Sequence, residues 1–324
     1  MTEFDLIARY FTRPVKRAAL GVGDDCALIA PTPGMQLAIS SDMLVDGRHF
    51  FSDVSPYSLG HKVLAVNLSD LAACGAKPVA FTLALALPSI DEAWLQEFSR
   101  GLRALADAHG CELIGGDTTQ GPLNICITVL GEVPRGQALL RSGAKVGDDI
   151  YVSGTLGDAR LALDALQGKV ELPADLLAHT RLRLEQPAPR VALGTALRGI
   201  ATAAIDISDG LAGDLGHILK ASRVGAQVDT DVTIKLIAAR AYKYWAAALF
   251  DTQKQLKMVL AGGDDYELAF TAPPTARGAV QAASASSQTQ VTRIGVIQSQ
   301  PGLRLVDGRG KPVNGQFTSF DHFA

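Results

Sequence analysis

Three oxygen-bearing side chains near the middle of the chain have a spacing that suits a cation bound beside a phosphate. Asp206, Ser208 and Asp209 follow an apolar run and precede Gly210. In a strand, Asp206 and Ser208 share a face because side chains alternate. Gly210 permits a tight turn, after which Ser208 or Asp209 would cap a helix over 211–221. Carboxylates at a helix N-terminus suit a divalent cation together with a phosphate. The simpler alternative makes Asp209 only a helix cap and Asp206 only a strand-end acid.

Two further apolar runs end in a similar way. Their polar ends are Ser40-Ser41-Asp42, after a predicted strand over 36–43, and Gly115-Gly116-Asp117, after a predicted strand over 111–114. The first end is a second cluster of oxygen ligands. At the second, the paired glycines allow a ligand or a backbone to approach closely. We therefore count Asp42 and Asp117 as candidate site residues.

Asp25 and Asp70 are candidates because of their surroundings. Asp25 follows two glycines and stands beside Asp24, although an acid pair in a turn is also ordinary turn chemistry. Asp70 shares a face with Asn67 on a helix predicted over 56–75, which is apolar on nearly every side. An unpaired buried carboxylate there would be costly or become protonated, so a metal, a base or a helix N-terminus has to meet it. The structural alternative is that Asp70 caps a neighbouring element.

Together these acids indicate Mg²⁺-dependent phosphate chemistry. The set is Asp25, Asp42, Asp70, Asp117, Asp206 and Asp209. Several carboxylates share a cavity as anions only with cations between them, and oxygen ligands select hard ions such as Mg²⁺. We find no Walker loop, Rossmann glycine fingerprint, or Ser-His-Asp or Cys-His set. The residues therefore predict an ATP-using enzyme that holds its phosphates through several Mg²⁺ ions. Direct in-line phosphoryl transfer is preferred to a covalent enzyme intermediate.

Composition is typical of a globular enzyme of about two domains. The chain has 324 residues, is 48% hydrophobic and 19% charged, and carries a net charge of -3. This charge, without a basic stripe, argues against nucleic-acid binding, and the apolar runs are too short or too interrupted to span a membrane. The N-terminus lacks the basic region of a signal peptide, and the four cysteines lack metal-type spacing. We expect a cytoplasmic enzyme.

Patterning predicts alternating helices and strands around a domain boundary near 136–147. Further helices are expected over 4–11, 91–109, 159–166, 176–184, 191–198, 234–249 and 278–286. Further strands are expected over 76–87, 125–133, 226–228, 291–297 and 303–306, and directly after the acid pairs Asp148-Asp149 and Asp264-Asp265. We interpret Asp148 and Asp149 as turn residues, because they precede their strand. The aromatic tail over 317–323 is expected to dock onto the body.

Eight short motifs, in order, resemble the thiamine-monophosphate kinases over nearly the whole chain. They are Gly21-Val22-Gly23-Asp24-Asp25-Cys26-Ala27, Ile39-Ser40-Ser41-Asp42, the stretches 66–73, 114–119, 205–211 and 262–268, Arg141-Ser142-Gly143-Ala144, and Phe320-Asp321-His322-Phe323. Each motif is weak alone, whereas eight in the right order are specific. The wider superfamily includes aminoimidazole-ribonucleotide synthetase, selenophosphate synthetase and a hydrogenase-maturation protein.

The resemblance implies a two-domain α/β fold (α+β in its layers) like that of aminoimidazole-ribonucleotide synthetase. An N-terminal domain, 1–140, would bind ATP and Mg²⁺ and pair its β-sheet across a homodimer. A C-terminal α/β domain, 141–324, would follow, with the nucleotide between the two. The implied reaction converts ATP and thiamine monophosphate to ADP and thiamine diphosphate, without a phosphoenzyme.

The resemblance also assigns residues. The implied Mg²⁺ ligands are Asp25, Ser40, Ser41, Asp42, Asp70, Asp117, Asp206 and Asp209. The implied nucleotide contacts are Gly116, Asp117, Arg141 and Ser208, and the implied contacts to thiamine monophosphate are His49, Asp264 and Phe320. Arg141, Asp42 and Asp209 would support the transition state. Taken alone, a loop residue such as Arg141 or His49 is more often simply solvated, although Arg is the usual fork for phosphate oxygens.

Three positions depart from the family pattern. Ser41 replaces the usual Thr and keeps a hydroxyl, whereas Asp264 replaces the usual Glu and is one methylene shorter. Phe320 replaces Trp or Tyr and keeps an aromatic face suited to the cationic thiazolium.

Three alternatives remain open at this point. A sister enzyme would phosphorylate an amide, a carboxylate or selenide, but selenophosphate synthetase needs a reactive Cys near the N-terminus, and Cys26 follows the acid pair instead of leading a glycine-rich loop. A nucleotide-binding regulator without catalysis would not need the intact acid set. A purely structural oligomer would leave Asp70 unexplained.

Overall fold

The chain folds into two compact units, each built around its own β-sheet. The computed structural model describes residues 2–242, 251–315 and 317. Unit 1 comprises Met1–Leu71 and Ala76–Ala138, and unit 2 comprises Ala72–Gly75 and Leu139–Ala324. Both units mix helices with strands, so the expected two-part α/β architecture is confirmed.

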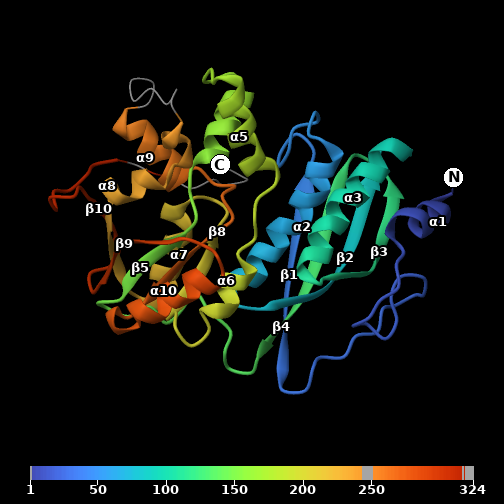
Figure 1. Ribbon diagram of the computed structural model, residues 1–324, viewed down its shortest axis with the longest axis horizontal. Coiled ribbons are helices and arrows are strands. Elements are labelled where there is room, and N and C mark those ends of the chain that lie inside the picture. The colour runs from blue at the N-terminus through green and yellow to red at the C-terminus, as the bar shows by residue number, and fades with distance from the viewer. Residues whose placement is uncertain (1, 243–250, 316, 318–324) are drawn as a thin grey trace. The chain divides into compact units, whose positions relative to one another are not determined.

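Unit 1 contains a four-stranded sheet in the order β1-β4-β2-β3. The strands are β1 (Met35–Val45), β2 (Lys77–Leu87), β3 (Glu112–Gln120) and β4 (Asn124–Pro134). β4 pairs antiparallel with β1 and β2, whereas β2 and β3 are parallel. Helices α2 (Pro56–Ala73) and α3 (Glu92–His109) lie side by side over this sheet (Figure 1).

Two glycines let α2 and α3 cross closely. A Cβ atom on Gly60 would lie 2.1 Å from the carbonyl oxygen of Phe98, and one on Gly101 would lie 2.0 Å from that of Tyr57. No real side chain fits at such distances, so the absence of a side chain at both positions sets the helix separation. α3 begins where the Asp91 carboxylate accepts hydrogen bonds from two backbone N–H groups of its first turn.

The N-terminus forms a shorter helix than expected. α1 (Glu3–Leu6) begins with a capping box between Thr2 and Asp5, and the chain continues as a π-helical turn over Ile7–Phe11. The predicted single helix over 4–11 is therefore divided into two parts.

Unit 2 contains a six-stranded sheet in the order β10-β7-β9-β5-β8-β6, antiparallel except for the parallel pair β10–β7. Its strands are β5 (Asp149–Ser153), β6 (Ala203–Ile207), β7 (Gly225–Asp229), β8 (Glu267–Ala272), β9 (Val291–Gln298) and β10 (Gly302–Val306). Its helices are α4 (Asp158–Leu166), α5 (Ala174–Glu185), α6 (Val191–Ala196), α7 (Leu211–Ser222), α8 (Thr230–Thr233), α9 (Thr252–Ala261) and α10 (Arg277–Ser286). A single apolar cluster joins strands β5, β6 and β9 to helices α7 and α9.

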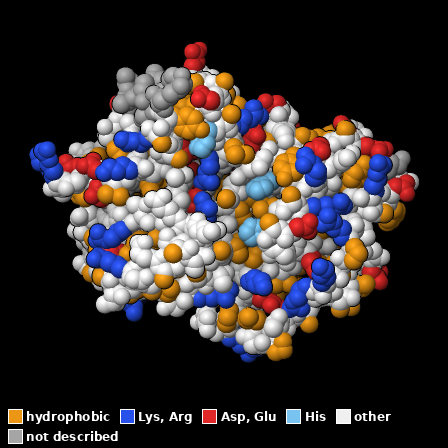
Figure 2. Space-filling view, viewed as in Figure 1, with side chains coloured by type: hydrophobic (Ala, Val, Ile, Leu, Met, Phe, Trp, Pro, Cys, Tyr) orange, Lys and Arg blue, Asp and Glu red, His pale blue; other side chains and the backbone are white. Residues whose placement is uncertain are grey.

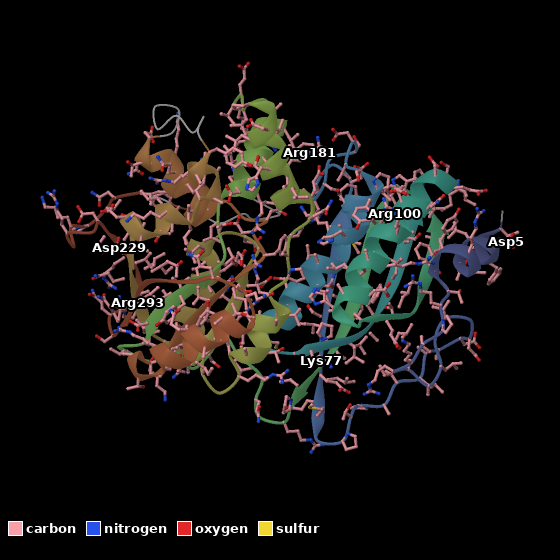
Figure 3. The ribbon with its side chains drawn as sticks, viewed as in Figure 1. Asp5, Lys77, Arg100, Arg181, Asp229 and Arg293 are labelled. Atoms are coloured by element: carbon pink, nitrogen blue, oxygen red, sulfur yellow. The ribbon has the colours of Figure 1, made fainter. Side chains whose placement is uncertain are left out.

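The acid pair at the start of β5 is structural, although only Asp148 closes a turn, whereas Asp149 is the first residue of the strand. Asp148 accepts hydrogen bonds from the Lys145 N–H and the Thr202 hydroxyl. Asp149 is 1% exposed and forms ion pairs with Arg277, at 2.6 Å, and with Arg293. Arg293 lies on β9 and is labelled in Figure 3. These side chains are therefore occupied within the fold.

Two predicted elements differ from those observed. β3 does not end at Ile114 but continues to Gln120, because Gly116 adopts φ 143° and allows β2 to approach. A Cβ atom on Gly116 would lie 1.8 Å from the Leu83 carbonyl oxygen. Within the described part of 234–249, two 3₁₀ turns, Ile234–Leu236 and Ala238–Ala241, replace the expected helix. The Asp158 carboxylate accepts the N–H groups of Ala238 and Ala239, which breaks the helical pattern there.

Two further expectations concern the distribution of charge on the surface and the docking of the aromatic tail. The face in Figure 2 intersperses Lys and Arg with Asp and Glu instead of gathering one sign. In the tail, Phe317 packs against the unit 2 core, whereas 318–324 lies outside the described residues.

Candidate functional site: two groups of oxygen ligands

In unit 1, the structure brings together three of the predicted ligands on β1 and α2. The Ser40 hydroxyl donates a hydrogen bond of 2.5 Å to the Asp70 carboxylate. The backbone N–H of Asp42 donates to the Asn67 side-chain oxygen at 3.1 Å. Ser40 and Asp42 share a face of β1 because they are two residues apart. The Asn67–Asp70 face of α2 therefore meets the Ser40–Asp42 face of β1.

Ser41 lies on the opposite face of β1. Its hydroxyl lies 2.9 Å from the Thr128 hydroxyl and donates to the Ile127 carbonyl oxygen at 3.1 Å. The structure thus separates Ser41 from the Ser40–Asp70 contact. Its implied role as a Mg²⁺ ligand stays a prediction.

Asp25 and Asp117 are both exposed, and Asp117 lies away from the Ser40–Asp70 contact. Asp25 stands in an irregular segment, where its N–H bonds to the Asp24 carboxylate at 2.8 Å. Asp117 on β3 pairs with Ala84 on β2, and β1 and β3 form opposite edges of the sheet. Three strand spacings amount to about 14 Å, so a single ion cannot bind Asp42 and Asp117 directly. If both residues bind Mg²⁺, they bind different ions.

His49 is held by the end of β1. Its Nδ1 accepts a hydrogen bond of 3.0 Å from the Val45 N–H, and its carbonyl oxygen accepts one from the Lys62 ammonium at 3.3 Å. The ring is half-buried, which differs from a solvated loop histidine. A neutral ring bonded in this way presents Nε2–H as a donor.

In unit 2, the end of β6 is organised by a residue that the sequence analysis missed. The Asp214 carboxylate accepts hydrogen bonds from the N–H groups of Ser208, Asp209 and Gly210, each at 3.1 Å. Gly210, with φ 114°, is the N-cap of α7, and no side chain caps that helix. The expected cap from Ser208 or Asp209 is therefore wrong, because Asp214 reaches back from the first helical turn. Burial, followed by the nearby Asp209 charge, raises the pKa of Asp214 to about 7.

A second segment of unit 2 lies directly beside this loop. The N–H of Asp264 donates to the Ser208 carbonyl oxygen, and that of Tyr266 donates to the Ile207 carbonyl oxygen, both at 2.8 Å. Asp264 and Tyr266 adopt left-handed φ values of 59° and 50°. These bonds place Asp264 next to the loop that carries Ser208. The structure thereby brings an implied substrate contact beside implied nucleotide and metal contacts.

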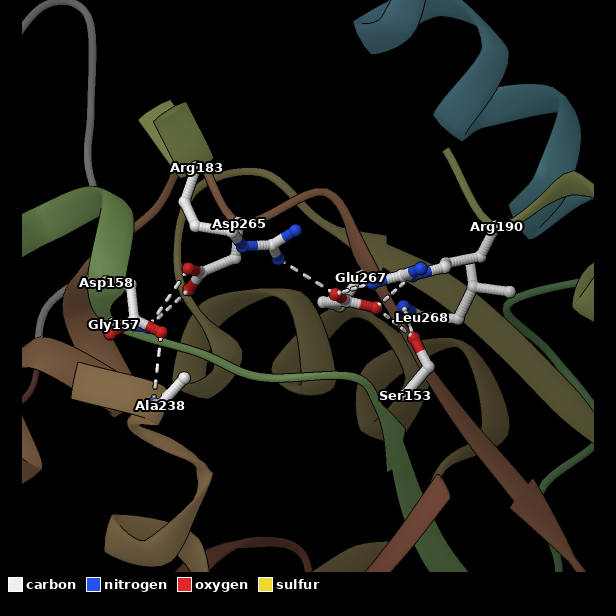
Figure 4. A network of polar contacts seen from close by, with 9 residues as sticks. All are labelled: Ser153, Gly157, Asp158, Arg183, Arg190, Ala238, Asp265, Glu267 and Leu268. Atoms are coloured by element: carbon white, nitrogen blue, oxygen red, sulfur yellow. Dashed lines mark hydrogen bonds and ion pairs between the residues drawn. The ribbon is translucent and has the colours of Figure 1, made fainter. Parts of the chain in front are cut away.

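Two fully buried acids anchor this second segment (Figure 4). The Asp265 carboxylate accepts the Gly157 N–H at 2.9 Å. The Glu267 carboxylate binds the Ser153 hydroxyl at 2.6 Å and the guanidinium groups of Arg183, at 2.9 Å, and Arg190. Burial raises the pKa of Asp265 well above its usual range. Sequence reasoning did not find these anchors, because Asp265 precedes β8 and the arginine partners of Glu267 are distant in the sequence.

Arg141 lies at the other end of α7 from Asp209. Its carbonyl oxygen accepts a hydrogen bond from the Ser222 hydroxyl at the last residue of α7. Twelve helical residues span about 18 Å, so the structure does not bring Arg141 to the Ser208–Asp209 loop. Phe320, the remaining predicted contact, lies outside the described residues.

The donor chemistry of both groups fits Mg²⁺. Among the residues that the structure describes, no three His, Cys, Asp or Glu side chains form a ready-made metal cluster. Mg²⁺ is usually bound by one or two carboxylates, with waters and phosphate oxygens completing its shell. A pair such as Ser40 with Asp70 suits that mode better than an all-protein cage. The described residues also include no helix that is long and apolar enough to cross a membrane.

Family models define the class of protein to which this fold belongs. The model described as AIR synthase related protein, N-terminal domain, matches residues 23–133, and the corresponding C-terminal domain model matches 145–308. The chain is thus a member of the AIR synthase related proteins, and the two matched regions fall in unit 1 and unit 2.

Individual relatives identify the family within this larger group of proteins. The chain is 47% identical to the thiamine-monophosphate kinase of Salmonella typhimurium, over 99% of this chain and 98% of that protein. It superimposes on the crystal structure of thiamine-monophosphate kinase from Stenotrophomonas maltophilia K279a with a TM-score of 0.82 and 45% identity, covering 96% of each chain. AaThiL complexed with AMPPCP and TMP gives a TM-score of 0.75 and 27% identity, covering 91% of this chain and 89% of that one. The chain belongs to the thiamine-monophosphate kinase family.

The opposite orientations of Ser40 and Ser41 lead to a first prediction. Ser40→Ala removes the hydroxyl bonded to Asp70, and we expect Mn²⁺ to bind about ten-fold more weakly, as is typical for loss of a group that orients a metal ligand. Ser41→Ala should cause a smaller loss, because its hydroxyl contacts β4 instead. Isothermal titration with Mn²⁺ measures both. Equal losses would contradict the separation of the two hydroxyls.

The buried Asp265 leads to a prediction about pH. Its folded-state pKa is raised, so the folded protein keeps a proton that the unfolded chain releases above about pH 4. This residue therefore lowers stability as pH rises from about 4 towards the raised pKa. Asp265→Asn removes that loss, so the variant should gain stability relative to the parent protein as pH increases. Urea unfolding at pH 5, 6.5 and 8 tests this. A pH-independent difference would contradict it.

Proposed function

We propose that this protein transfers a phosphoryl group from ATP to thiamine monophosphate, giving thiamine diphosphate and ADP in a Mg²⁺-dependent reaction. The observation that carries the proposal is full-length identity of 47% to a thiamine-monophosphate kinase. The related AaThiL has been solved with AMPPCP, an ATP analogue, and TMP, which we take as thiamine monophosphate. The protein is accordingly a phosphotransferase with a phosphate group as acceptor.

The oxygen ligands of both units support Mg²⁺ as the required ion. Bound Mg²⁺ would neutralise charge on the phosphates of the nucleotide. We assign its ligands to the implied set, Asp25, Ser40, Asp42, Asp70, Asp117, Asp206 and Asp209, with Ser41 dependent on the test above. In unit 1 the Ser40–Asp70 hydrogen bond supports this assignment, because it fixes the carboxylate orientation. The exposed positions of Asp25 and Asp117 leave both accessible to phosphate-bound ions.

The remaining assignments concern the two substrates. Gly116, Asp117, Arg141 and Ser208 would contact the nucleotide, and His49, Asp264 and Phe320 would contact thiamine monophosphate. The contact between the segments of Ser208 and Asp264 supports a shared site for the two substrates. Arg141 and Phe320 rest on the resemblance alone.

The chemistry needs little from the protein besides position and charge. The attacking phosphate oxygen of thiamine monophosphate is already ionised, so no strong general base is required. The protein has to hold two anionic substrates in line and offset their repulsion. Carboxylates that bind Mg²⁺, together with His49 as a donor, would provide this combination; the resemblance alone adds Arg141.

The central test is turnover. We expect the purified protein to convert thiamine monophosphate to thiamine diphosphate with ATP and Mg²⁺, and EDTA to abolish the product. Asp42→Ala and Asp209→Ala should lose at least about a hundred-fold in kcat while keeping the fold, because each removes a charged ligand that acts in the transition state. Exposed Glu171→Ala is a matched acid-to-alanine control and should keep full activity. Chromatography of the product measures all three, with circular dichroism for the fold.

Other outcomes separate the rival functions. ADP release with an amide, carboxylate or selenide acceptor, but not with thiamine monophosphate, would identify a sister enzyme of the same superfamily. Metal-dependent ATP binding without consumption of any acceptor would favour a regulator. Full activity of Asp42→Ala or Asp209→Ala would contradict the metal-ligand assignment.

We also propose a homodimer formed through β1. This strand is an edge of the unit 1 sheet, where a second copy can add a strand. Ile39 and Met43 share a face of β1 and are 62% and 54% exposed, which is unusual for such side chains on one strand. A second copy would cover both.

The dimer has its own test. Ile39→Lys combined with Met43→Lys should shift the protein to monomer, because a buried interface would then hold unpaired charges. Leu182→Lys on α5, 52% exposed in the parent protein, is the matched control and should not change the assembly. Light scattering after size-exclusion chromatography gives the mass. A dimer that persists in the double variant would contradict an interface at this face of β1.

A further inference from the structure

The loop that precedes α7 is held from inside by one carboxylate oxygen. Asp214 Oδ2 accepts the backbone N–H groups of three successive residues, Ser208, Asp209 and Gly210, at 3.1 Å each. Asp214 is only 3% exposed. In an ordinary N-cap, a residue before the helix accepts hydrogen bonds from N–H groups of the first turn. Here Asp214, in the first turn, accepts hydrogen bonds from N–H groups that lie before the helix.

The backbone at this point needs such support. Gly210 adopts φ 114°, which side chains rarely permit, and a Cβ atom there would lie 2.9 Å from the Ala261 Cα. α7 has no side-chain cap of the usual kind. Without the Asp214 carboxylate, three N–H groups beside a buried glycine would lose their acceptor, and buried unpaired donors are costly. The loop would have to adopt another conformation.

The same loop carries two proposed ligand residues, and its backbone also bonds to Asp264, which is a proposed contact to thiamine monophosphate. Ser208 and Asp209 are half-buried, unlike Asp214, so the three N–H groups turn inward while these two side chains remain accessible. The Ser208 carbonyl oxygen also accepts the Asp264 N–H at 2.8 Å. A change in the loop conformation would therefore reach three proposed site residues together.

We propose that Asp214 is a positioning residue that orients Asp209 and Ser208 for the Mg²⁺–nucleotide complex. This inference rests on the proposed function, because it takes Asp209 as a metal ligand and Ser208 as a nucleotide contact. Asp214 itself binds neither metal nor substrate; its carboxylate acts through the backbone. We therefore expect the loss of Asp214 to weaken Mg²⁺ binding more strongly than its effect on folding stability can explain.

Asp158 provides a matched control within unit 2. It is 1% exposed, and its carboxylate accepts the backbone N–H groups of Ala238 and Ala239 at 3.1 and 2.9 Å. Its burial and its type of bonding resemble those of Asp214, but the segment that it holds carries no proposed ligand. A purely structural role predicts the same behaviour for both residues.

The experiment compares Asp214→Ala and Asp214→Asn with Asp158→Ala. Calorimetry measures the Kd of Mg²⁺ in the presence of the non-hydrolysable analogue AMPPCP, and thermal unfolding without metal measures stability. Both alanine variants should unfold at lower temperature. Only Asp214→Ala should raise the Mg²⁺ Kd, by ten-fold or more, whereas Asp158→Ala should change it less than two-fold. Asp214→Asn keeps an acceptor oxygen without the charge and should give an intermediate rise.

Each possible result either supports or contradicts the positioning role of Asp214. Equal changes in Kd for the two alanine variants, or a change in unfolding temperature alone, would overturn the proposal. If Asp214→Ala does not fold, the asparagine variant decides, and an unchanged Kd in that variant overturns it. Turnover of thiamine monophosphate by the parent protein is measured in parallel. A parent protein that binds Mg²⁺–AMPPCP but makes no thiamine diphosphate would refute the proposed function while leaving the test of Asp214 valid.

Discussion

Several loops of this protein depend on buried or half-buried carboxylates that accept hydrogen bonds from backbone N–H groups. Asp214 binds three such groups before α7, and Glu112 binds those of Lys16, Arg17 and Ala18 in unit 1. Asp158 binds two more. Hydrogen bonds to charged groups contribute roughly 1.5–3 kcal/mol each, more than neutral ones, and a buried carboxylate without them would be strongly destabilising. Irregular segments are thereby fixed without regular secondary structure.

Neighbouring acids consequently have different roles. Asp265 and Glu267 turn into unit 2 and bind Gly157, Arg183 and Arg190, whereas Asp264 between the glycines and the strand is only half-buried. The left-handed backbone at residues 264 and 266 permits this division, because it rotates successive side chains away from a simple strand alternation. Among acids close in sequence, the inner ones shape the backbone and the outer ones remain available to a ligand.

The sequence predicted much of the fold and marked both groups of oxygen ligands as candidates. It marked Ser40, Ser41 and Asp42 as a strand-end cluster, and helix periodicity placed Asp70 with Asn67. The structure brings Ser40 and Asp42 to the Asn67–Asp70 face of α2. Such patterns are local, so a single sequence is enough to recognise them. The helices and strands that enclose the site were recognised for the same reason.

The sequence did not reveal which acids point inward. Glu267 is fixed by arginines 77 and 84 residues away, and nothing local marks those partners. Asp214 falls inside the helix predicted over 211–221. Usually the acid that accepts N–H groups at a helix start precedes the helix, so an acid within the first turn does not stand out in the sequence. The extension of β3 was missed because Gly116 reads as a loop residue, although its lack of a side chain is what allows β2 to pair with it.

Holding the ligands through the backbone has a consequence for metal binding. Like charges repel strongly when carboxylates converge, so a site that gathers all its acids in one place would be unstable without cations. Here β1 and β3 keep Asp42 and Asp117 at opposite sheet edges of unit 1, and in unit 2 the buried Asp214 binds the backbone N–H of Asp209. Within unit 1, Mg²⁺ is therefore not needed to offset repulsion between Asp42 and Asp117. Each ion can instead keep phosphate oxygens in its shell, so that its binding free energy contributes to holding the nucleotide in position.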